Sequence, residues 1–306
     1  MPKVEPYPII KLEPEWVRSD ETMGTKDKAW FLLPDTNERW LFKYARINEG
    51  VSTGEHWAEK IAAEIAELIG IPHAAVELAE FDGRMGSLSR RFPELFQRAI
   101  ELIHGNDLLP GFVLGYDREK RFRQTNHTLV NILAAVSRAI SDEEQRSSAL
   151  TALAGYVVFD ALIVNTDRHH ENWALLRDNR PGGGVRYSVA PSFDHASSLG
   201  RELLPDKLDS WANEKWRAEW YANRAPGAIF LREDQKHGAN PLRLAEFALR
   251  LRPRRVAPWL EKLRGLDIAQ LSDIIQRVPE AHMAEQSRRF CLSLLGYTLQ
   301  HLQNLK

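Results

Sequence analysis

The chain has 306 residues, of which 43% are apolar and 27% charged, the composition of a soluble globular protein with a sizeable core. A net charge of −1 excludes a general attraction to nucleic acid or an anionic membrane, although it leaves a local patch open. The single cysteine, Cys291, excludes an internal disulfide and cysteine-based zinc clusters, and its apolar helical setting predicts a buried thiol. The N-terminus has no apolar signal core and no run is long enough to span a bilayer, so we expect a cytoplasmic protein that contacts no membrane.

The first 95 residues predict a small lobe of strands with one helix. The runs "KAWFLLP" and "ERWLFKYAR" are short and aromatic-rich, and the turn signal "PDTN" between them predicts a β-hairpin. From residue 54 the apolar residues follow a helical period, which ends at Gly70 and Pro72. The stretch "AAVELAEFDGRMGSLSRRF" then predicts two strands joined by the turn "DGRMG".

Residues 96–306 predict a larger, mostly helical lobe. The segments "TLVNILAAVSRAI" and "ALTALAGYVVFDALIVN" are strongly apolar helices, and "NWALLRDNRPGGGVRYSVAPSFD" predicts an inserted hairpin. The fold class is therefore α+β with two lobes, at residues 1–95 and 96–306. Trp211, Trp216 and Trp220 have near-helical spacing, which fits a partner platform or a packed helix face, and we favour the packed face.

The most informative motif lies in "IVNTDRHHENWALL", directly after the second apolar helix. Asp167 and Asn172 have the spacing Asp-x-x-x-x-Asn that phosphotransferase catalytic loops use. In such a loop the Asp accepts the proton of the attacking hydroxyl, and the Asn oxygen helps to hold Mg²⁺ against the phosphates. Because Asp and Asn are also common in ordinary turns, the spacing needs support from the rest of the chain.

Two further residues supply that support. Asp194 follows the predicted hairpin in "SVAPSFDHASSLG", where a metal-binding Asp would be delivered by a strand, although it is equally placed to cap a turn. Lys43 lies in "RWLFKYAR", where strand alternation puts it on one face and its aromatic neighbours on the other. It is either a phosphate-binding lysine or a surface lysine with a buried stem.

The predicted first helix and the segment before the lysine strand complete the pattern. Glu55 and Glu59 are one helical turn apart, and we favour Glu59, the deeper of the two, as the partner of Lys43. "SDETMGTKDKAWFLL" holds Gly24 and Lys28 and could present backbone N–H groups to phosphates, although one Gly makes a poor glycine-rich loop. Each feature is weak alone, but the features follow each other in the order that kinases require.

These segments resemble a known family. "VVFDALIVNTDRHHENWALL" followed by "YSVAPSFDHASSLG" is similar to the C-terminal kinase domain of HipA-type proteins, bacterial serine/threonine kinases of which many are toxins of toxin–antitoxin pairs. The family's Asp-x-His-x-x-Asn loop and Pro-x-aromatic-Asp motif match Asp167, His169 and Asn172, and then Pro191, Phe193 and Asp194. "MGTKDKAWFLL", "GEHWAEKIAAEIAELIGIP" and "LSRRF" resemble further family segments, so the resemblance covers residues from about 20 to 290.

The resemblance implies a bilobal protein-kinase-like fold that uses ATP and Mg²⁺. It also implies a protein substrate with a Ser or Thr acceptor, the kinase itself included, and a small antitoxin protein as partner. From the net charge we expect no direct nucleic-acid binding. The roles that the resemblance implies fall on the catalytic base Asp167, the loop-supporting His169, the metal ligands Asn172 and Asp194, the ATP-phosphate lysine Lys43, and the phosphate neighbours Gly24 and Lys28.

Three alternatives stay open at this point. Asp167, His169, His170 and Glu171 could ligate zinc or manganese in a hydrolase, although adjacent His170 and Glu171 would not readily converge on one ion. His195, beside Asp194, is the strongest residue in favour of that reading. A small-molecule or lipid kinase would use the same Asp-x-x-x-x-Asn spacing. The third alternative is a non-catalytic binding module with a degenerate kinase fold, but such a module would not need Lys43, Asp167, Asn172 and Asp194 together.

Overall fold

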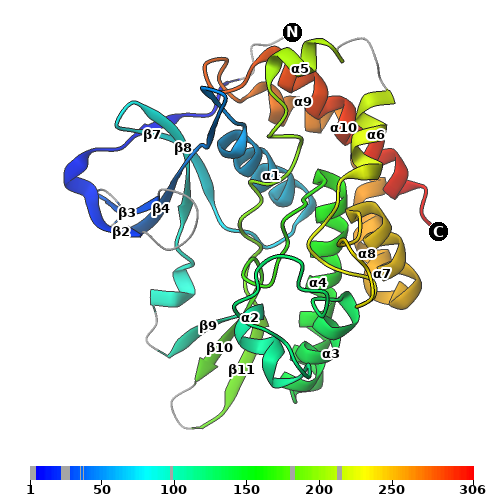
Figure 1. The fold of residues 1–306 in the computed structure, drawn as a ribbon. Helices are drawn as coiled ribbons and strands as arrows, with labels where there is room; N and C mark the ends of the chain where they lie inside the picture. The colour runs from blue at the N-terminus through cyan, green and yellow to red at the C-terminus, as the bar shows by residue number, and fades with distance from the viewer. Residues whose placement is uncertain are drawn as a thin grey trace.

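The computed structural model describes residues 5–21, 28–34, 36, 38–96, 99–179, 183–211 and 216–306. The largest sheet among these residues has six strands. Figure 1 shows this sheet on one side, most of the helices on the other, and helix α1 between them. The strands are β1 (Ile9–Lys11), β2 (Val17–Glu21), β3 (Lys28–Leu33), β4 (Glu38–Tyr44), β5 (Ile47–Asn48), β6 (Val51–Ser52), β7 (Val76–Phe81), β8 (Arg84–Arg90), β9 (Ile100–His104), β10 (Ala174–Asn179) and β11 (Val185–Val189).

The helices follow mainly in the second part of the chain. They are α1 (Glu55–Ile69), α2 (Gly105–Leu108), α3 (Leu129–Ala139), α4 (Glu143–Ile163), α5 (Pro205–Asp209), α6 (Trp216–Arg224), α7 (Pro241–Leu251), α8 (Pro253–Arg264), α9 (Ile268–Gln276) and α10 (Glu285–Gln303), with the 3-10 turns η1 (Pro14–Trp16), η2 (Pro93–Phe96) and η3 (Leu109–Gly111). The α+β class is confirmed. The expected boundary between residues 95 and 96 falls in η2, and the division into two domains stays a prediction.

The large sheet has the order β1-β7-β8-β4-β3-β2, antiparallel except for the β1–β7 pair. Its hairpins confirm the predicted strands, and the second turn closes at Asp82 and Gly83, both with positive φ. The expected alternation on β4 is also confirmed. Trp40 and Phe42 are buried in an aromatic cluster with Phe31, whereas Lys43 faces the opposite side.

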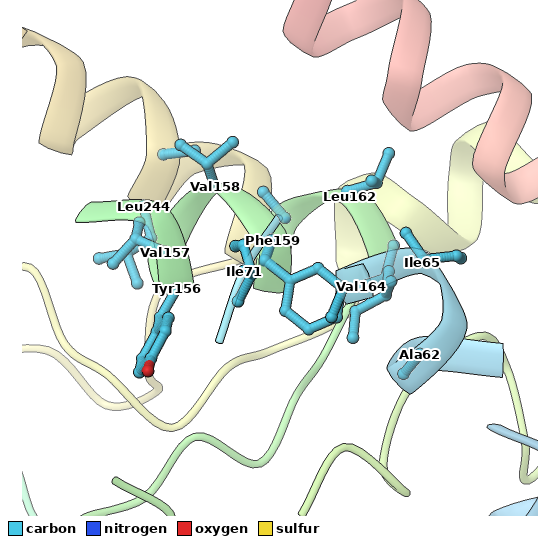
Figure 2. Close-up of a cluster of buried hydrophobic side chains, with 14 of the residues drawn as sticks. Ala62, Ile65, Ile71, Tyr156, Val157, Val158, Phe159, Leu162, Val164 and Leu244 are labelled. Carbon is cyan, nitrogen blue, oxygen red and sulfur yellow. The ribbon is translucent and has the colours of Figure 1, made fainter. Parts of the chain in front are cut away.

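Helix α1 ends where the sequence predicts. Gly70 takes the left-handed conformation (φ 67°), and its N–H donates to the carbonyls of Ala66 and Glu67, an αL cap that glycine adopts at little cost. Its apolar face packs on the central helix α4, and Figure 2 shows Ala62 and Ile65 of α1 beside Phe159 of α4. This contact joins the sheet side of the molecule to the helical side.

Helix α4 is the centre of the helical side. The side chain of Asp142 caps it by accepting from the N–H of Gln145 at 2.9 Å, and α3, α7, α8, α10 and β11 all contact it. The expectation that no run could span a bilayer was wrong, because α4 has the length and apolar composition to do so. However, 72% of its apolar window is buried inside this structure, as is usual for a core helix.

A shorter β-structure and the cysteine also match expectation. β10 pairs with β11 as the predicted hairpin, and β9 adds a third strand, while residues 180–182 at its tip lie outside the described part.

Cys291 is fully buried and its Sγ–H donates to the carbonyl of Leu199 at 3.2 Å. Burial raises the pKa of this thiol far above its ordinary value, which makes it unreactive.

The packed face predicted for the tryptophans is wrong for two of them. Trp216 and Trp220 are 50% and 41% exposed, because α6 buries Ala218 and Ala222 instead. The guanidinium of Arg217 lies 4.0 Å above the Trp216 ring. Trp211 is partly buried and joins the main core.

Gly155 lets the ring of Trp259 pack closely on α4. A Cβ at this position would lie 2.4 Å from Cε2 of Trp259, whose indole N–H donates to the carbonyl of Thr151 at 2.8 Å. We expect Gly155→Ala to lower the free energy of unfolding by about 1 to 2 kcal/mol, since overpacking outweighs the better helix propensity of Ala. Gly111→Ala is the matched control, because a Cβ added there would have no atom within 4 Å. Chemical denaturation measures both, and a more stable Gly155→Ala variant would contradict the packing argument.

Candidate active site

The loop that carries Asp167 begins at the end of α4. Val164 takes the left-handed conformation (φ 52°, ψ 50°), which a β-branched residue adopts only against strain of about 1 to 2 kcal/mol. The next residue holds the turn in place. The backbone N–H of Asn165 donates to the carbonyl of Asp160 at 2.8 Å, and its side-chain amide donates to the Asp160 carboxylate at 2.9 Å.

A buried ion pair fixes the loop from below. The guanidinium of Arg168 binds both carboxylate oxygens of Asp160, at 2.8 Å through Nε and 2.7 Å through Nη2. Its remaining N–H groups donate to the carbonyl of Asn172 at 2.8 Å, the hydroxyl of Ser192 at 3.0 Å and the carbonyl of Phe193 at 3.3 Å. The side chains of Asp160 and Arg168 are only 4% and 5% exposed, so this charge pair is part of the core.

Asp167 and Asn172 face the same cavity from this loop. The side-chain amide of Asn172 donates to the backbone carbonyl of Asp167 at 2.8 Å, which closes the loop between them. Because its nitrogen is used in this bond, the amide oxygen of Asn172 is the side-chain atom that remains for a metal ion. The Asp167 side chain is one third exposed, so it can meet a group that enters from solvent.

Asp194 and Lys43 meet across the cavity. The ammonium of Lys43 lies 3.1 Å from Oδ1 of Asp194, which itself has a strained left-handed backbone (φ 57°). Burial would lower the pKa of Lys43, but the carboxylates of Asp194, Glu59 and Glu55 raise it above its ordinary value. The lysine therefore stays charged, which is the state that phosphate binding requires.

The expected contact between Lys43 and Glu59 needs correction. Within the described residues the ion pair of Lys43 is with Asp194, whereas Glu59 accepts a hydrogen bond from the backbone N–H of His195 at 2.8 Å. Burial would raise the pKa of Glu59, but the hydrogen bonds of His195 and the charge of Lys43 lower it. Glu59 is thus an ionised group that holds the backbone next to Asp194. Glu55 instead binds Arg201, at 2.8 Å.

The two histidines of the loop bond to different partners. His169 is buried, with the Glu171 N–H donating to its Nδ1 at 3.1 Å and Nε of Arg121 at 2.9 Å from its Nε2. Burial and the charge of Arg121 lower its pKa to about 3, so it is neutral at physiological pH. His170 turns toward the hydroxyl of Tyr116, 2.8 Å from its Nδ1. These contacts agree with the expected role of His169 in supporting the loop.

The expected phosphate loop falls only partly within the described residues. Gly24 lies outside them, so the structure says nothing of its expected role. Lys28 opens β3, lies opposite Lys43 in the register with β4, and also faces the cavity. Two cationic side chains of the sheet therefore line the same wall.

The cavity has a volume of about 1120 Å³, somewhat above the range of ordinary small-ligand pockets. Lys28 and Lys43 line it on the sheet side, and Asp167, Asn172 and Asp194 line it on the helical side. Oxygen ligands from a carboxylate and an amide are those that Mg²⁺ prefers, so the site fits that ion chemically.

The hydrolase alternative finds no support in this geometry. Among the residues that the structure describes, no group of three or more His, Cys, Asp or Glu side chains is placed to hold a metal ion. His195, the residue that most favoured this alternative, bonds through Nε2 to the hydroxyl of Ser192 at 2.7 Å. Its other nitrogen lies 3.5 Å from Glu59, so both sides of the ring are occupied by protein.

Sequence reasoning missed Asp160, Arg168 and Ser192. Asp160 is an acidic residue inside the apolar run "VVFDALIV", and a carboxylate in such a run needs a buried partner. That signal was readable, although only the structure identifies Arg168 as the partner. Ser192 has no comparable signal, because a single serine before an aromatic residue is common.

The arrangement of a β-rich lobe, a helical lobe and a cavity between a lysine strand and an Asp-containing loop defines the protein-kinase-like class of fold. The family profile described as HipA-like C-terminal domain matches residues 21–251, and the chain belongs to this family. No curated protein matches the chain in a sequence comparison.

Solved structures support the same fold. The chain is similar to a Helicobacter pylori proinflammatory kinase, CtkA, with a TM-score of 0.73 and 18% identity over 97% of this chain and 98% of that one. It is also similar to HipA of Shewanella oneidensis MR-1, solved in a toxin–antitoxin complex with HipB and operator DNA, with a TM-score of 0.56 and 12% identity. That match covers 95% of this chain and 65% of the Shewanella chain. At these identities the likeness shows the fold, which confirms the expected bilobal kinase-like architecture.

The buried pair gives a direct test of what holds the loop. Asp160→Asn leaves the Arg168 guanidinium buried without its counter-charge, and we expect it to lower the free energy of unfolding by about 3 to 5 kcal/mol. The double variant Asp160→Leu/Arg168→Met removes both charges and should recover much of this loss. Asp273→Asn, on an exposed face of α9, should change stability by less than about 0.5 kcal/mol. Denaturant unfolding of all three decides the point, and a single Asp160→Asn variant as stable as the control would refute it.

Buried histidines predict a loss of stability in acid. Burial lowers the pKa of His56 and His127 to about 4 and that of His169 to about 3. Because the unfolded chain binds these protons near pH 6.5 and the folded chain does not, the free energy of unfolding falls as the pH drops below 6.5. For these three residues the expected loss between pH 7 and pH 5 is about 5 kcal/mol.

Denaturation curves at pH 7, 6 and 5 measure this dependence. The His56→Gln variant keeps an N–H that can donate to the carbonyl of His282, as His56 does through Nε2 at 3.1 Å, but it cannot bind the extra proton. Its pH dependence should therefore be shallower by about one proton. Stability that stays flat from pH 7 to 5 would be inconsistent with neutral buried histidines.

Proposed function

We propose that this protein is a HipA-type kinase that uses ATP and Mg²⁺ to phosphorylate a Ser or Thr hydroxyl of a protein. One observation carries the proposal: Lys43, Asp167, Asn172 and Asp194 all line a single cavity. The family membership and the kinase-like fold support it.

Each side chain has a distinct task in this proposal. Asp167 accepts the proton of the acceptor hydroxyl while that oxygen forms its bond to the γ-phosphorus and the bond from the γ-phosphorus to ADP breaks. Lys43 and Lys28 neutralise phosphate charge from the sheet side. Asn172 and Asp194 would hold Mg²⁺, which neutralises charge on the phosphates when it is bound. His169 keeps the loop in shape and, being neutral, adds no charge.

The present ion pair between Lys43 and Asp194 is compatible with these tasks. Both groups are charged and lie 3.1 Å apart, so each neutralises the other before a nucleotide is bound. Phosphate oxygens would take the place of Asp194 beside Lys43, and a divalent cation would take the place of Lys43 beside Asp194. The ion pair therefore keeps a phosphate-binding ammonium and a cation-binding carboxylate side by side.

The identity of partners belongs to the proposal as well. The Shewanella structure contains an antitoxin protein, HipB, beside HipA. By this likeness we propose a small antitoxin protein as a partner of this chain and a cytoplasmic site of action, where ATP is available. A small-molecule or lipid acceptor is the alternative that the catalytic residues alone do not separate.

The proposal is tested by transfer of labelled γ-phosphate from ATP, in the presence of Mg²⁺, to the protein itself or to lysate proteins. We expect Asp167→Asn to reduce labelling about 10²- to 10⁴-fold, because the general base is lost while the fold is kept. Asp273→Asn is the control that should label like the wild type, since it lies on an exposed face outside the cavity.

Two results would contradict the proposal. The first is equal labelling by wild type and Asp167→Asn, and the second is no labelling by either in the presence of Mg²⁺. Label found only in the lipid or small-molecule fraction would establish the alternative acceptor.

A further inference from the structure

The cavity wall is much more basic than the chain as a whole. Among its described lining residues are ten Lys or Arg and only five Asp or Glu, whereas the whole chain has a net charge of −1. Lys28 and Lys43 account for phosphate binding on the sheet side. The remaining cations include a group on the helical side, which the nucleotide phosphates do not explain.

Some of these helical-side cations lie on the loop of residues 117–125. The loop is closed by its own hydrogen bonds: the side chain of Asp117 accepts from the N–H of Glu119 at 3.0 Å, and the amide of Gln124 donates to the carbonyl of Asp117 at 2.6 Å. Arg123, directly before Gln124, is exposed and has a left-handed conformation (φ 53°), and its neighbour Phe122 is 65% exposed. An ordered loop thus presents a cation and an aromatic ring to the cavity mouth.

This loop is attached to the catalytic loop. Arg121, two residues before Arg123, lies with Nε 2.9 Å from Nε2 of His169 and 3.6 Å from the carboxylate of Glu171. Its contacts place the basic loop next to Asp167 on the helical side. The sheet, with Lys43, lies across the cavity.

A second loop brings Lys236 to the same place. Its two ends pack backbone to backbone, since a Cβ on Gly238 would lie 2.0 Å from the carbonyl oxygen of Gly227. The N–H of Phe230 donates to the carbonyl of His127 at 2.9 Å, which joins this loop to the first one. Lys236 is exposed and lines the cavity.

Arg123 and Lys236 differ from the other cations of this wall. Arg118 is paired with Asp107 at 2.7 Å, and Arg121 with Glu171. In the described part of the chain, neither Arg123 nor Lys236 has an ion-pair partner, so their charges are available to a bound molecule.

The direction of phosphoryl transfer assigns these two cations to the acceptor. In an in-line displacement the hydroxyl enters opposite the leaving ADP. With the phosphates on the sheet side at Lys28 and Lys43, the acceptor reaches Asp167 past the helical side, where Arg123 and Lys236 lie. Carboxylates are the complementary groups for two such cations.

We propose that the acceptor is an acidic polypeptide segment, with Asp or Glu residues flanking the phosphorylated Ser or Thr, held by Arg123 and Lys236. This inference rests on the proposed kinase function and specifies its substrate class. Phe122 gives the segment an apolar contact beside the charges. A polycationic small molecule, in contrast, would be repelled by the same wall.

Short synthetic peptides test this surface. One has a central Ser with Asp and Glu flanks, and the other has the same Ser with Lys flanks. We compare kcat/KM for labelled phosphate transfer by the wild type, by Arg123→Glu/Lys236→Glu, and by the control Arg254→Glu, an exposed position in the first turn of α8 outside the cavity.

A second readout does not depend on transfer. Fluorescence anisotropy measures binding of the same peptides to Asp167→Asn protein, with and without the two charge reversals, in the presence of a non-hydrolysable ATP analogue. Failure of transfer with intact acidic preference in binding would contradict the proposed function and support the acceptor surface.

The expected result is a clear preference of the wild type for the acidic peptide that weakens with added salt. The double charge reversal should lower kcat/KM for that peptide by roughly tenfold and improve the Lys-flanked peptide, whereas Arg254→Glu should behave as the wild type. Equal binding of both peptides, better binding of the Lys-flanked peptide, or an unchanged preference after charge reversal would overturn the proposal. So would an RNA oligonucleotide that binds more tightly than the acidic peptide.

Discussion

The geometry of the candidate site depends on one buried ion pair, Asp160 with Arg168. A guanidinium has five N–H donors, and here every one has an acceptor: two on Asp160, and one each on the carbonyl of Asn172, the hydroxyl of Ser192 and the carbonyl of Phe193. Removing two charges from water costs several kcal/mol for each, which a buried pair offsets only when its remaining donors are also satisfied. The same bonds tie the central helix to both chain segments that face the cavity.

The network continues from that pair to the sheet side, and its proton positions follow from the acceptors. Nδ1 of His195 faces the ionised carboxylate of Glu59, so it carries the proton of the neutral imidazole. Its Nε2 therefore accepts from the O–H of Ser192, whose oxygen accepts from Arg168. Burial lowers the pKa of His195, which keeps the ring neutral. Asp194 lies between these anchored neighbours, and their bonds offset the strain of its left-handed backbone. Its carboxylate is therefore held by a chain of bonds that begins in the core of the helical lobe.

Sequence alone predicted the parts of this structure that depend on local order. The hairpins, the first helix and the alternation that turns Lys43 toward the cavity follow from periods of two and 3.6 residues, which neighbouring residues determine. The partner of Glu59 could not be predicted, because it depends on which way a segment more than a hundred residues later approaches helix α1. The prediction that Trp216 and Trp220 are packed was wrong for a related reason. Their spacing matches a helix face equally well on either side, and the small residues Ala218 and Ala222 allow the closer packing.

The net charge of the chain also fails to predict the charge of the cleft. A net charge of −1 averages over a surface, whereas a cleft with low-dielectric walls is governed by the residues that line it. Here folding gathers basic residues from the sheet, from the loop around Arg123 and from the loop around Lys236, three segments that are distant in the sequence. Acidic residues within that wall are largely engaged, as Asp194 is with Lys43 and Glu171 with Arg121. A near-neutral chain can therefore carry a cleft with a net positive wall.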